Sequence, residues 1–415
     1  MIIKGKYNNA VIYTTVIEDD AKQQIKDMCN SSVFKDSVIR IMPDVHSGAG
    51  CTIGTTMTIK DKVVPNMVGV DIGCGMEVIE LKDAKIDYKT LDEFSHANIP
   101  AGMNHRKTKH EYVKYVNIDK LACAKKVNID KGYLSLGTLG GGNHFIEVDE
   151  DDNGTLYLVI HTGSRHLGLE VAEFYQKQAP LYHKTGYKNA LALIEEYKKQ
   201  GRQQEIQQKL DEVKKWAKNA SASKTDDVFL NQYLEGELLN DYLNDMRIMQ
   251  EFAFYNRKAI ADDIIKGLNL TVASRFTTIH NYIDLDAMIL RKGAVSAKKG
   301  EKLLIPLNMR DGSLICIGKG NKAWNCSAPH GAGRLMSRTK AVKTLSLNEY
   351  KKQMKGIYST TVCLETIDEA PMAYKRLEDI VDNIATTVTV KKRIRPTYNF
   401  KSAEQTKDAW RKRKK

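Results

Sequence analysis

Short apolar runs rich in β-branched residues occur toward both ends of the chain, and a region of different periodicity lies between them. The runs include MEVIEL and TLYLVIHTG within residues 1–180, and KLLIPL and SLICIG within residues 271–400. Runs of this length predict strands joined by loops. Residues 187–270 carry apolar residues at three- and four-residue spacing, which is typical of helices, with a polar break at 219–227.

This alternation predicts an α+β (mixed α/β) fold with central β-sheets and a helical insertion at 187–270. The chain has 415 residues and is 42% hydrophobic, which is enough for a sizeable buried core. Candidate site residues fall on both sides of the helical region, so we expect one large domain over 1–415, ending in a basic tail at 402–415.

The bulk properties also restrict the location of the protein. No apolar run approaches the ~20 residues of a membrane span. The N-terminal sequence MIIKGKYNNAVIYTT has neither the apolar stretch nor the cleavage site of a signal peptide. We therefore expect a soluble, cytoplasmic protein without a membrane partner.

A formal net charge of +13 favours polyanionic partners, nucleic acid first. We assign part of this excess positive charge to a C-terminal tail, which contains KKRIRP at 391–396 and RKRKK at 411–415. A solvated tail that only keeps the protein soluble is the alternative interpretation. The seven cysteines are dispersed without a C-x-x-C pair, which argues against a disulfide framework and a zinc knuckle.

Potential metal ligands recur at the ends of apolar runs, beside glycine-rich or polar loops, where functional groups often collect. One carboxylate, one thiolate and three imidazoles suit Mn²⁺, Zn²⁺, Fe²⁺ or Co²⁺ better than Ca²⁺ or Mg²⁺. A thiolate among them could bridge two ions for phosphoryl chemistry. The alternative is that each residue is merely packed or solvated. The five candidates are Asp71, Cys74, His144, His161 and His280.

Two further features concern nucleotides. SLGTLGGGNH could cradle a phosphate through backbone N–H groups, or it could be a tight turn, and the chain has no P-loop motif. The only Asp-Gly pair, Asp311-Gly312, follows Met309 and Arg310, so the K-x-D-G lysine motif of common nucleotidyltransferases is missing. If the protein attaches a nucleotide to itself, His330 in NCSAPHGAGR is the available nucleophile.

Six motifs resemble, in order, those of the RtcB RNA ligases. They are MPDVHSGAG (42–50), VDIGCGM (70–76), GGGNHFIEV (140–148), HTGSRHLG (161–168), HNY (280–282) and HGAGRLMSR (330–338). The resemblance spans nearly the whole chain. It implies an RtcB-like domain and a GTP- and Mn²⁺-dependent ligase. Such an enzyme joins RNA 2′,3′-cyclic phosphate or 3′-phosphate ends to 5′-hydroxyl ends, in tRNA splicing or RNA repair.

The resemblance also implies roles for particular residues. Asp71, Cys74 and His144 would hold one Mn²⁺, and Cys74, His161 and His280 would hold the second. His330 would attack the α-phosphate of GTP and become guanylylated. The RNA 3′-phosphate would then take GMP from it, giving an RNA-ppG end that the 5′-hydroxyl attacks.

Four positions match family residues that contact the guanylate or the incoming phosphate: Asn143, Glu147, Arg165 and, in the ending RIRPTYNFKS, Lys401. The implied partners are cleaved tRNA or other RNA, GTP and an archease-like protein as a candidate activator. The chain departs from the family at NMRDGSLICIGKG (308–320), where no contact is transferred, and in continuing past Lys401.

Two other functions fit the same residues. A dinuclear metallophosphoesterase would need the metal ligands but not His330. A non-catalytic RNA-binding module would need only the basic surface, and its affinity would fall with salt. Retention of a covalent label from GTP separates the ligase from both.

Overall fold

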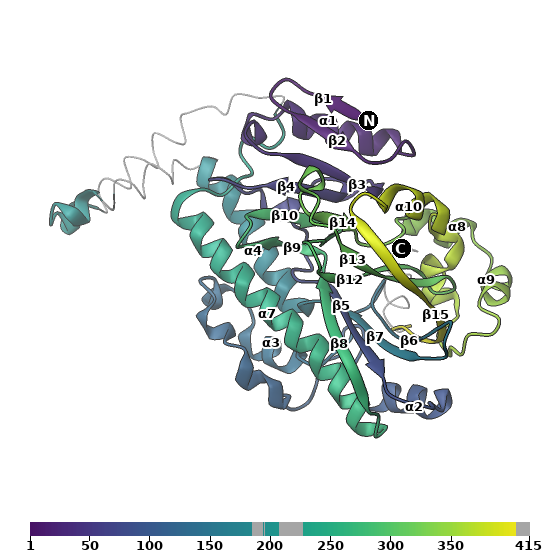
Figure 1. Cartoon of the computed structure of the whole chain (residues 1–415). Coiled ribbons are helices and arrows are strands. Elements are labelled where there is room, and N and C mark those ends of the chain that lie inside the picture. Colours follow the sequence, from purple (N-terminus) through teal and green to yellow (C-terminus); the bar gives the residue numbers. More distant parts are fainter. Residues whose placement is uncertain (185–193, 195, 207–226, 404–415) are drawn as a thin grey trace.

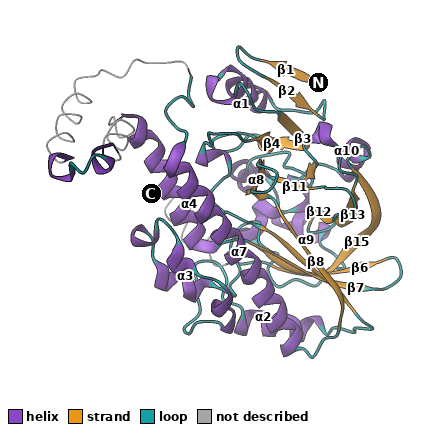
Figure 2. Cartoon of the chain, turned by 60° about the vertical axis from the view of Figure 1, so that its left-hand side comes forward, coloured by secondary structure: helices purple, strands orange, loops and turns teal. Residues whose placement is uncertain are grey.

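The computed structural model describes residues 1–184, 194, 196–206 and 227–403. Two large β-sheets and a two-stranded ribbon form the body, and long helices pack along one side of it (Figures 1 and 2). The expected α+β class is confirmed. Most of the helical stretches predicted before residue 227, and the polar break at 219–226, lie outside the described residues.

The first sheet has six strands in the order β1-β2-β3-β4-β10-β9. Strands β2 and β3 are parallel, and the other neighbours are antiparallel. Helix α1 (Asp19–Asn30) packs on this sheet through Ile25 and Met28. The strand bounds are β1 (Ile2–Lys4), β2 (Asn9–Ile12), β3 (Ile39–His46), β4 (Ile53–Thr58), β9 (Asn281–Asp284) and β10 (Ile289–Lys292).

The second sheet has seven strands in the order β12-β13-β15-β6-β7-β5-β8, all antiparallel to their neighbours. Its edge strands β8 and β12 contact each other, so the sheet curls into a half-barrel. The bounds are β5 (Gly75–Leu81), β6 (Phe145–Asp151), β7 (Leu156–Thr162), β8 (Val272–Ile279), β12 (Lys302–Asn308), β13 (Gly312–Gly318) and β15 (Val388–Phe400). The ribbon pairs β11 (Ala294–Ser296) with β14 (Ser327–Pro329).

The central strand β5 is buried on both faces. Met76 and Val78 pack inside the half-barrel, whereas Ile79 and Leu81 join the core under the helices. Apolar residues therefore occur on both sides of β5, and the sequence MEVIEL shows no strict alternation of apolar and polar residues. The strands predicted at MEVIEL, KLLIPL and SLICIG are confirmed.

Helix α7 (Gly236–Gly267) crosses the outer face of the second sheet and contacts β5 and β7. Its Arg257 is fully buried and donates from one Nη to the carbonyls of Gly73 and Thr162, at 2.7 and 3.1 Å. No helix within the described residues is long and apolar enough to cross a membrane. The other described helices include α2 (Tyr88–Asn98), α3 (Ile129–Ser135), α4 (Arg165–Lys184), α8 (Arg338–Thr344), α9 (Leu347–Gln353) and α10 (Leu377–Ile384).

The assignment of KKRIRP (391–396) to a basic tail is wrong, because these residues lie inside β15, between β13 and β6. Ile394 is buried in the half-barrel core. The basic side chains beside it bond to neighbouring strands and loops: Lys392 to Asp151 at 2.8 Å, and Arg395 to Asp152 at 2.6 Å. Of the tail predicted at 402–415, residues 404–415 lie outside the described part of the chain.

Replacing Gly75 with alanine is expected to destabilise the fold. An added Cβ would lie 2.0 Å from the carbonyl oxygen of Thr278 and 2.8 Å from Cα of Ile279, so β5 and β8 would have to separate. Overpacking of this kind costs about 1–3 kcal/mol. Chemical denaturation measures the loss. Gly300→Ala is the control for backbone strain alone, because Gly300 has a φ of +81° and no atom lies within 4 Å of the added Cβ; it should lose only about 1 kcal/mol. Equal stability of Gly75→Ala and the wild type would contradict the packing argument.

Candidate active site

The register of three adjacent strands brings together residues that are distant in the sequence. Strand β5 lies between β7 and β8, with Met76 opposite His161 and Gly75 opposite Ile279. Cys74, directly before β5, therefore lies beside His280, directly after β8. The backbone N–H of His280 donates to the carbonyl of Cys74 at 2.9 Å.

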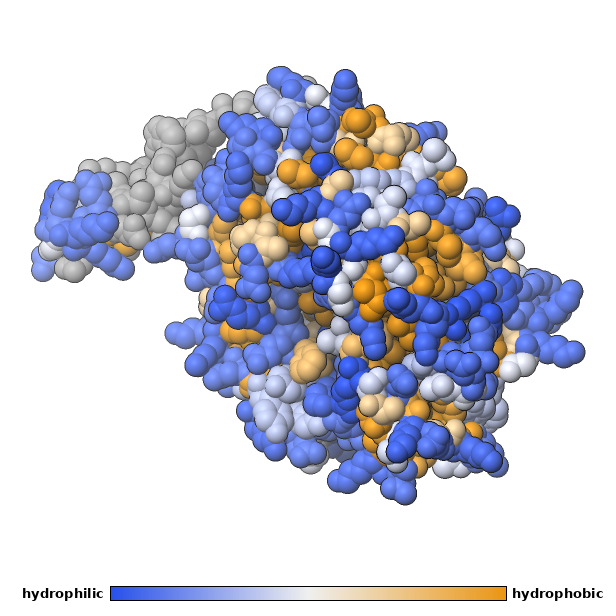
Figure 3. Space-filling view, viewed as in Figure 1, coloured by the Kyte–Doolittle hydropathy of each residue, from blue (hydrophilic) through white to orange (hydrophobic). Residues whose placement is uncertain are grey.

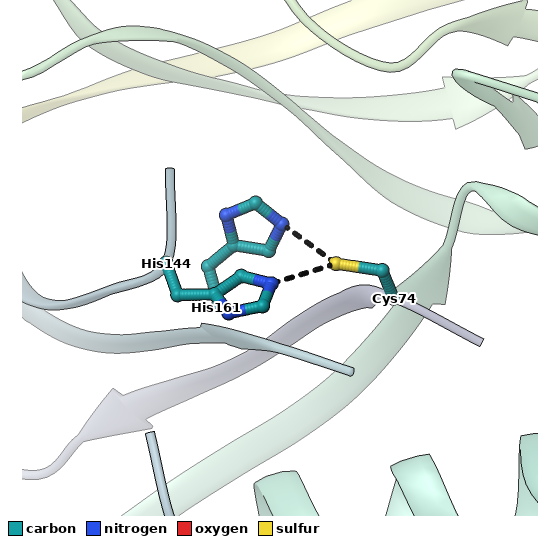
Figure 4. Close-up of side chains that lie close together, drawn as sticks. All are labelled: Cys74, His144 and His161. Carbon is teal, nitrogen blue, oxygen red and sulfur yellow. Dashed lines mark hydrogen bonds between the residues drawn. The ribbon is translucent and has the colours of Figure 1, made fainter. Parts of the chain in front are cut away.

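His144 completes a cluster around the thiol. It directly precedes β6, whose first residue, Phe145, lies opposite His161. Nε2 of His144 and Nε2 of His161 each lie 3.2 Å from Sγ of Cys74, and Figure 4 shows both rings turned toward the sulfur. The ligand atoms of these three buried residues all lie within 4.8 Å of one another.

The remaining two predicted ligands flank this cluster. Oδ2 of Asp71 lies 2.9 Å from Nε2 of His144, and Oδ1 accepts the backbone N–H of Ser164 at 3.0 Å. Nε2 of His280 lies 3.4 Å from Nε2 of His161. The structure thus brings all five predicted side chains into one continuous group.

The electrostatics of this group suit a metal centre. Burial lowers the pKa of His161 and His280 well below the ordinary value, so both rings are neutral and keep a lone pair for a cation. Burial, reinforced by the charge of Asp71, raises the pKa of the Cys74 thiol, and a bound divalent cation would displace its proton. The donor set of one thiolate, imidazoles and a carboxylate therefore fits a transition-metal ion.

His330 lies beside this group, directly after β14. Its ring centroid is 5.0 Å from that of His280. The buried carboxylate of Asp44, on β3, lies 2.7 Å from Nδ1 of His330 and accepts its backbone N–H at 3.1 Å. A carboxylate at Nδ1 fixes the ring orientation and favours the tautomer with its proton on Nδ1. Nε2 is then the ring nitrogen that keeps a lone pair.

A cavity of about 290 Å³ opens over His330, His161 and His280. This is near the lower end of small-molecule pockets, which start at about 300 Å³. Glu369 lies on its wall with Oε1 3.3 Å from an Nη of Arg334, and it also pairs with Arg338.

Three of the four predicted guanylate contacts line this cavity: Asn143, Glu147 and Lys401. Nζ of Lys401 lies 3.3 Å from the carbonyl of Asn143 and 3.4 Å from Oε2 of Glu369. Burial raises the pKa of Glu147, and Asn399 donates to Oε2 of Glu147 at 2.6 Å.

Arg165, the fourth predicted contact, is not among the residues that line the cavity. Its Nε donates to Oγ1 of Thr138 at 3.0 Å, and an Nη donates to the carbonyl of Gly102. The structure therefore holds Arg165 against the neighbouring loops, close enough to Asp71 and Cys74 for their charges to act on its guanidinium.

Residue-by-residue reasoning missed four functional candidates: Asp44, Arg334, Arg338 and Glu369. Asp44, Arg334 and Arg338 occur inside the motifs MPDVHSGAG and HGAGRLMSR, so those motifs carried a usable signal. Glu369 lies in the segment Leu364–Glu369, which has no pattern that marks it. Burial alone would raise its pKa, but the charges of Arg338, Lys401 and Arg334 hold the pKa of Glu369 below its ordinary value.

Known proteins similar to this chain share one family name. The model of the family described as tRNA-splicing ligase RtcB matches residues 24–133 and 116–402. The RNA-splicing ligase RtcB of Escherichia coli K12 is 30% identical, over 88% of this chain and 90% of the relative. The tRNA-splicing ligases RtcB of Aeropyrum pernix and Archaeoglobus fulgidus are 27% and 26% identical, over 85% and 88% of this chain and 84% and 87% of theirs. The chain therefore belongs to the tRNA-splicing ligase RtcB family.

Proposed function

We propose that this protein is a GTP- and Mn²⁺-dependent RNA ligase of the cytoplasm. It joins 2′,3′-cyclic phosphate or 3′-phosphate ends to 5′-hydroxyl ends through a guanylylated histidine, in tRNA splicing or RNA repair. The observation that carries the proposal is His330, held by Asp44 at the cavity and 5.0 Å from the ring of His280. The family membership supports the choice of RNA as substrate.

The residues present fit two cations that share one ligand. Asp71, Cys74 and His144 would hold one Mn²⁺, and Cys74, His161 and His280 would hold the other. When bound, these ions neutralise charge on the triphosphate and orient the phosphoryl group for in-line attack.

His330 would carry the nucleotide. With its proton on Nδ1 and directed at Asp44, Nε2 attacks the α-phosphate of GTP. A P–N bond forms, the bond to the bridging oxygen breaks, and pyrophosphate leaves. Asp44 stabilises the positive charge that develops on the ring, as a carboxylate does behind a catalytic histidine.

Two further transfers return the enzyme to its starting state. At a 2′,3′-cyclic end, water first breaks the bond from phosphorus to O2′ and leaves a 3′-phosphate. The RNA 3′-phosphate then attacks the phosphorus on His330 and takes GMP, which restores the lone pair on Nε2. The 5′-hydroxyl then attacks the RNA phosphate of the RNA-ppG end, and GMP leaves. Arg334 and Arg338, on the cavity wall, present planar guanidinium groups that suit phosphate oxygens. An archease-like protein is the candidate activator.

Guanylate recognition is assigned to Asn143, Glu147 and Lys401, whose side chains line the cavity. The carboxylate of Glu147 accepts hydrogen bonds, so its partners would be N–H or O–H groups of the nucleoside. Arg165 matches a phosphate-contacting position of the family. Its present bonds to Thr138 and Gly102 would have to change for it to reach a ligand.

Incubation with [α-³²P]GTP and Mn²⁺ tests the proposal. We expect an acid-labile label that survives denaturing electrophoresis, and ligation of RNA with 3′-phosphate and 5′-hydroxyl ends. His330→Ala should abolish both, whereas the exposed His105→Ala should leave both unchanged. A wild-type protein that hydrolyses cyclic phosphate ends without retaining label would be a metallophosphoesterase instead.

Guanylate binding should strengthen as the pH rises. Because burial raises the pKa of Glu147, beside the equally buried Asp149, a larger share of this carboxyl is protonated at pH 6 than at pH 8. Its acceptor form therefore increases as the pH rises across this range. Calorimetry with GMP at both pH values should show a gain in affinity at the higher pH. Glu147→Gln should lose this gain while retaining any pH dependence of the metal ligands. An equal gain in both proteins would remove Glu147 from guanylate recognition.

A further inference from the structure

The segment that follows the nucleophile is strongly basic. Between residues 331 and 363 the chain has seven basic residues and one acidic residue, Glu349. This segment contains helices α8 and α9. The seven basic residues are Arg334, Arg338, Lys340, Lys343, Lys351, Lys352 and Lys355.

This segment begins at the cavity and leads away from it. Arg338 is the first residue of α8 and lines the cavity, yet 44% of its side chain is exposed. Helix α8 contacts the segment Leu364–Glu369, whose last residue is also on the cavity wall. Figure 1 shows α8 and α9 together at one edge of the molecule, next to the end of β15.

The two arginines and the five lysines differ in their partners. Arg334 and Arg338 both pair with Glu369, and Arg338 also pairs with Asp368 at 2.6 Å. The lysines are exposed, and none forms an ion pair with a carboxylate of the residues that the structure describes. We call these five residues the lysine face: Lys340, Lys343, Lys351, Lys352 and Lys355.

The helices concentrate these charges instead of dispersing them. On α8, Ala341 faces the core, and Lys340 and Lys343 share the outer side at a spacing of three. On α9, Tyr350 is buried and Lys351 and Lys352 are exposed, and Lys355 lies in the turn that follows the helix. Like charges at the spacing found on α8 repel and oppose helix formation. Figure 3 shows hydrophilic side chains projecting at the edge that α9 occupies in Figure 1.

A repeated, unneutralised positive charge suits a polyanion with evenly spaced charges, such as a phosphodiester backbone. We propose that the lysine face binds the backbone of the RNA strand whose end enters the cavity. This inference rests on the proposed ligase function. RNA is favoured over an acidic protein because a strand that reaches His330 must cross the cavity mouth, where Arg338 and α8 begin.

Binding of a fluorescent single-stranded RNA with a 3′-phosphate tests the proposal, with anisotropy measured over a range of salt concentrations and without GTP. The test variant carries all five lysines of the face as glutamine. The control variant carries five other exposed lysines as glutamine, which gives the same change in net charge. These control residues do not line the cavity: Lys60, Lys82, Lys85, Lys125 and Lys126.

Each phosphate contact on a single strand contributes about 0.7 to the slope of log affinity against log salt. We expect the test variant to lose roughly 2–3.5 from this slope and at least about tenfold in affinity at low salt. The control should stay within about twofold of the wild type. Labelling by GTP should persist in both variants, because the lysine face lies outside the guanylate site.

Two smaller variants locate the contacts. Lys340→Gln with Lys343→Gln tests α8. Lys351→Gln, Lys352→Gln and Lys355→Gln together test α9 and the turn after it. Each of these two variants should lose part of the salt-dependence slope. A test variant that binds RNA as the control does would overturn the proposal. Reduced ligation with unchanged RNA affinity would also overturn it. Absence of GTP labelling in the wild type would instead refute the proposed function, whatever the binding data.

Discussion

Replacing Cys74 with alanine is expected to abolish ligation and to remove bound metal from both proposed positions. The thiol lies 3.2 Å from Nε2 of both His144 and His161, so one side chain is shared by the whole group. Loss of a residue that only hydrogen-bonds to a metal ligand weakens metal binding by roughly 10–100-fold. Loss of a ligand itself should weaken metal binding by more than this. Metal analysis after dialysis should therefore show fewer than one Mn²⁺ per chain in this variant.

Cys51→Ala is the matched control, because Cys51 is equally buried but lies outside the site. It should retain both the metal and the ligation activity, with a comparable loss of stability. Comparing the two variants separates the removal of a ligand from the removal of a buried sulfur atom. Wild-type metal content and ligation in Cys74→Ala would refute the bridging role.

Replacing Asp44 with asparagine should slow labelling of His330 by about 10²–10⁴-fold, by analogy with the loss of the carboxylate behind a catalytic histidine. Oδ2 of Asp44 lies 2.7 Å from Nδ1 of His330 and also accepts its backbone N–H. An amide removes the negative charge that stabilises the ring when it becomes positively charged. Single-turnover labelling from GTP measures the effect directly.

A purely structural role for Asp44 predicts a different pattern. In that case metal content and GMP affinity should fall together with the labelling rate. We expect both to stay within about threefold of the wild type in Asp44→Asn, with only the rate reduced. Asp92→Asn is the control, because Asp92 is also buried but binds Tyr398 and Thr360, away from the cavity. An unchanged labelling rate in Asp44→Asn would remove Asp44 from the mechanism.

The fold class and the five-residue cluster could be predicted from the sequence for one physical reason. Buried strands such as β5 and β7 leave short runs dominated by apolar residues, and residues at their ends, such as Cys74 and His161, stand out beside glycine or polar neighbours. The assignment of residues 391–396 to a basic tail is wrong because it rests on their charge and neglects the apolar residue among them. In β15 the basic side chains bond to Asp151 and Asp152 while Ile394 fills the core.

Local sequence patterns could not predict contacts between segments that are far apart in the chain. The bond between Asp44 and His330 joins residues 286 positions apart. No spacing rule connects them, although both lie in motifs shared with the family. Arg165 shows the opposite case, since its motif was clear but the structure turns its guanidinium toward Thr138 and Gly102.

The proposed metal ligands lie next to different strands, and this has a consequence during protein synthesis. Asp71 and Cys74 leave the ribosome long before His280, and strand β8, which places His280 beside Cys74, is made still later than β7. Pairing across such separations is slow compared with local helix formation. Because a preformed metal site rarely exists before folding, a nascent chain would carry only isolated ligands. A proposed metal position that includes His280 would therefore be complete only after β8 has paired with β5.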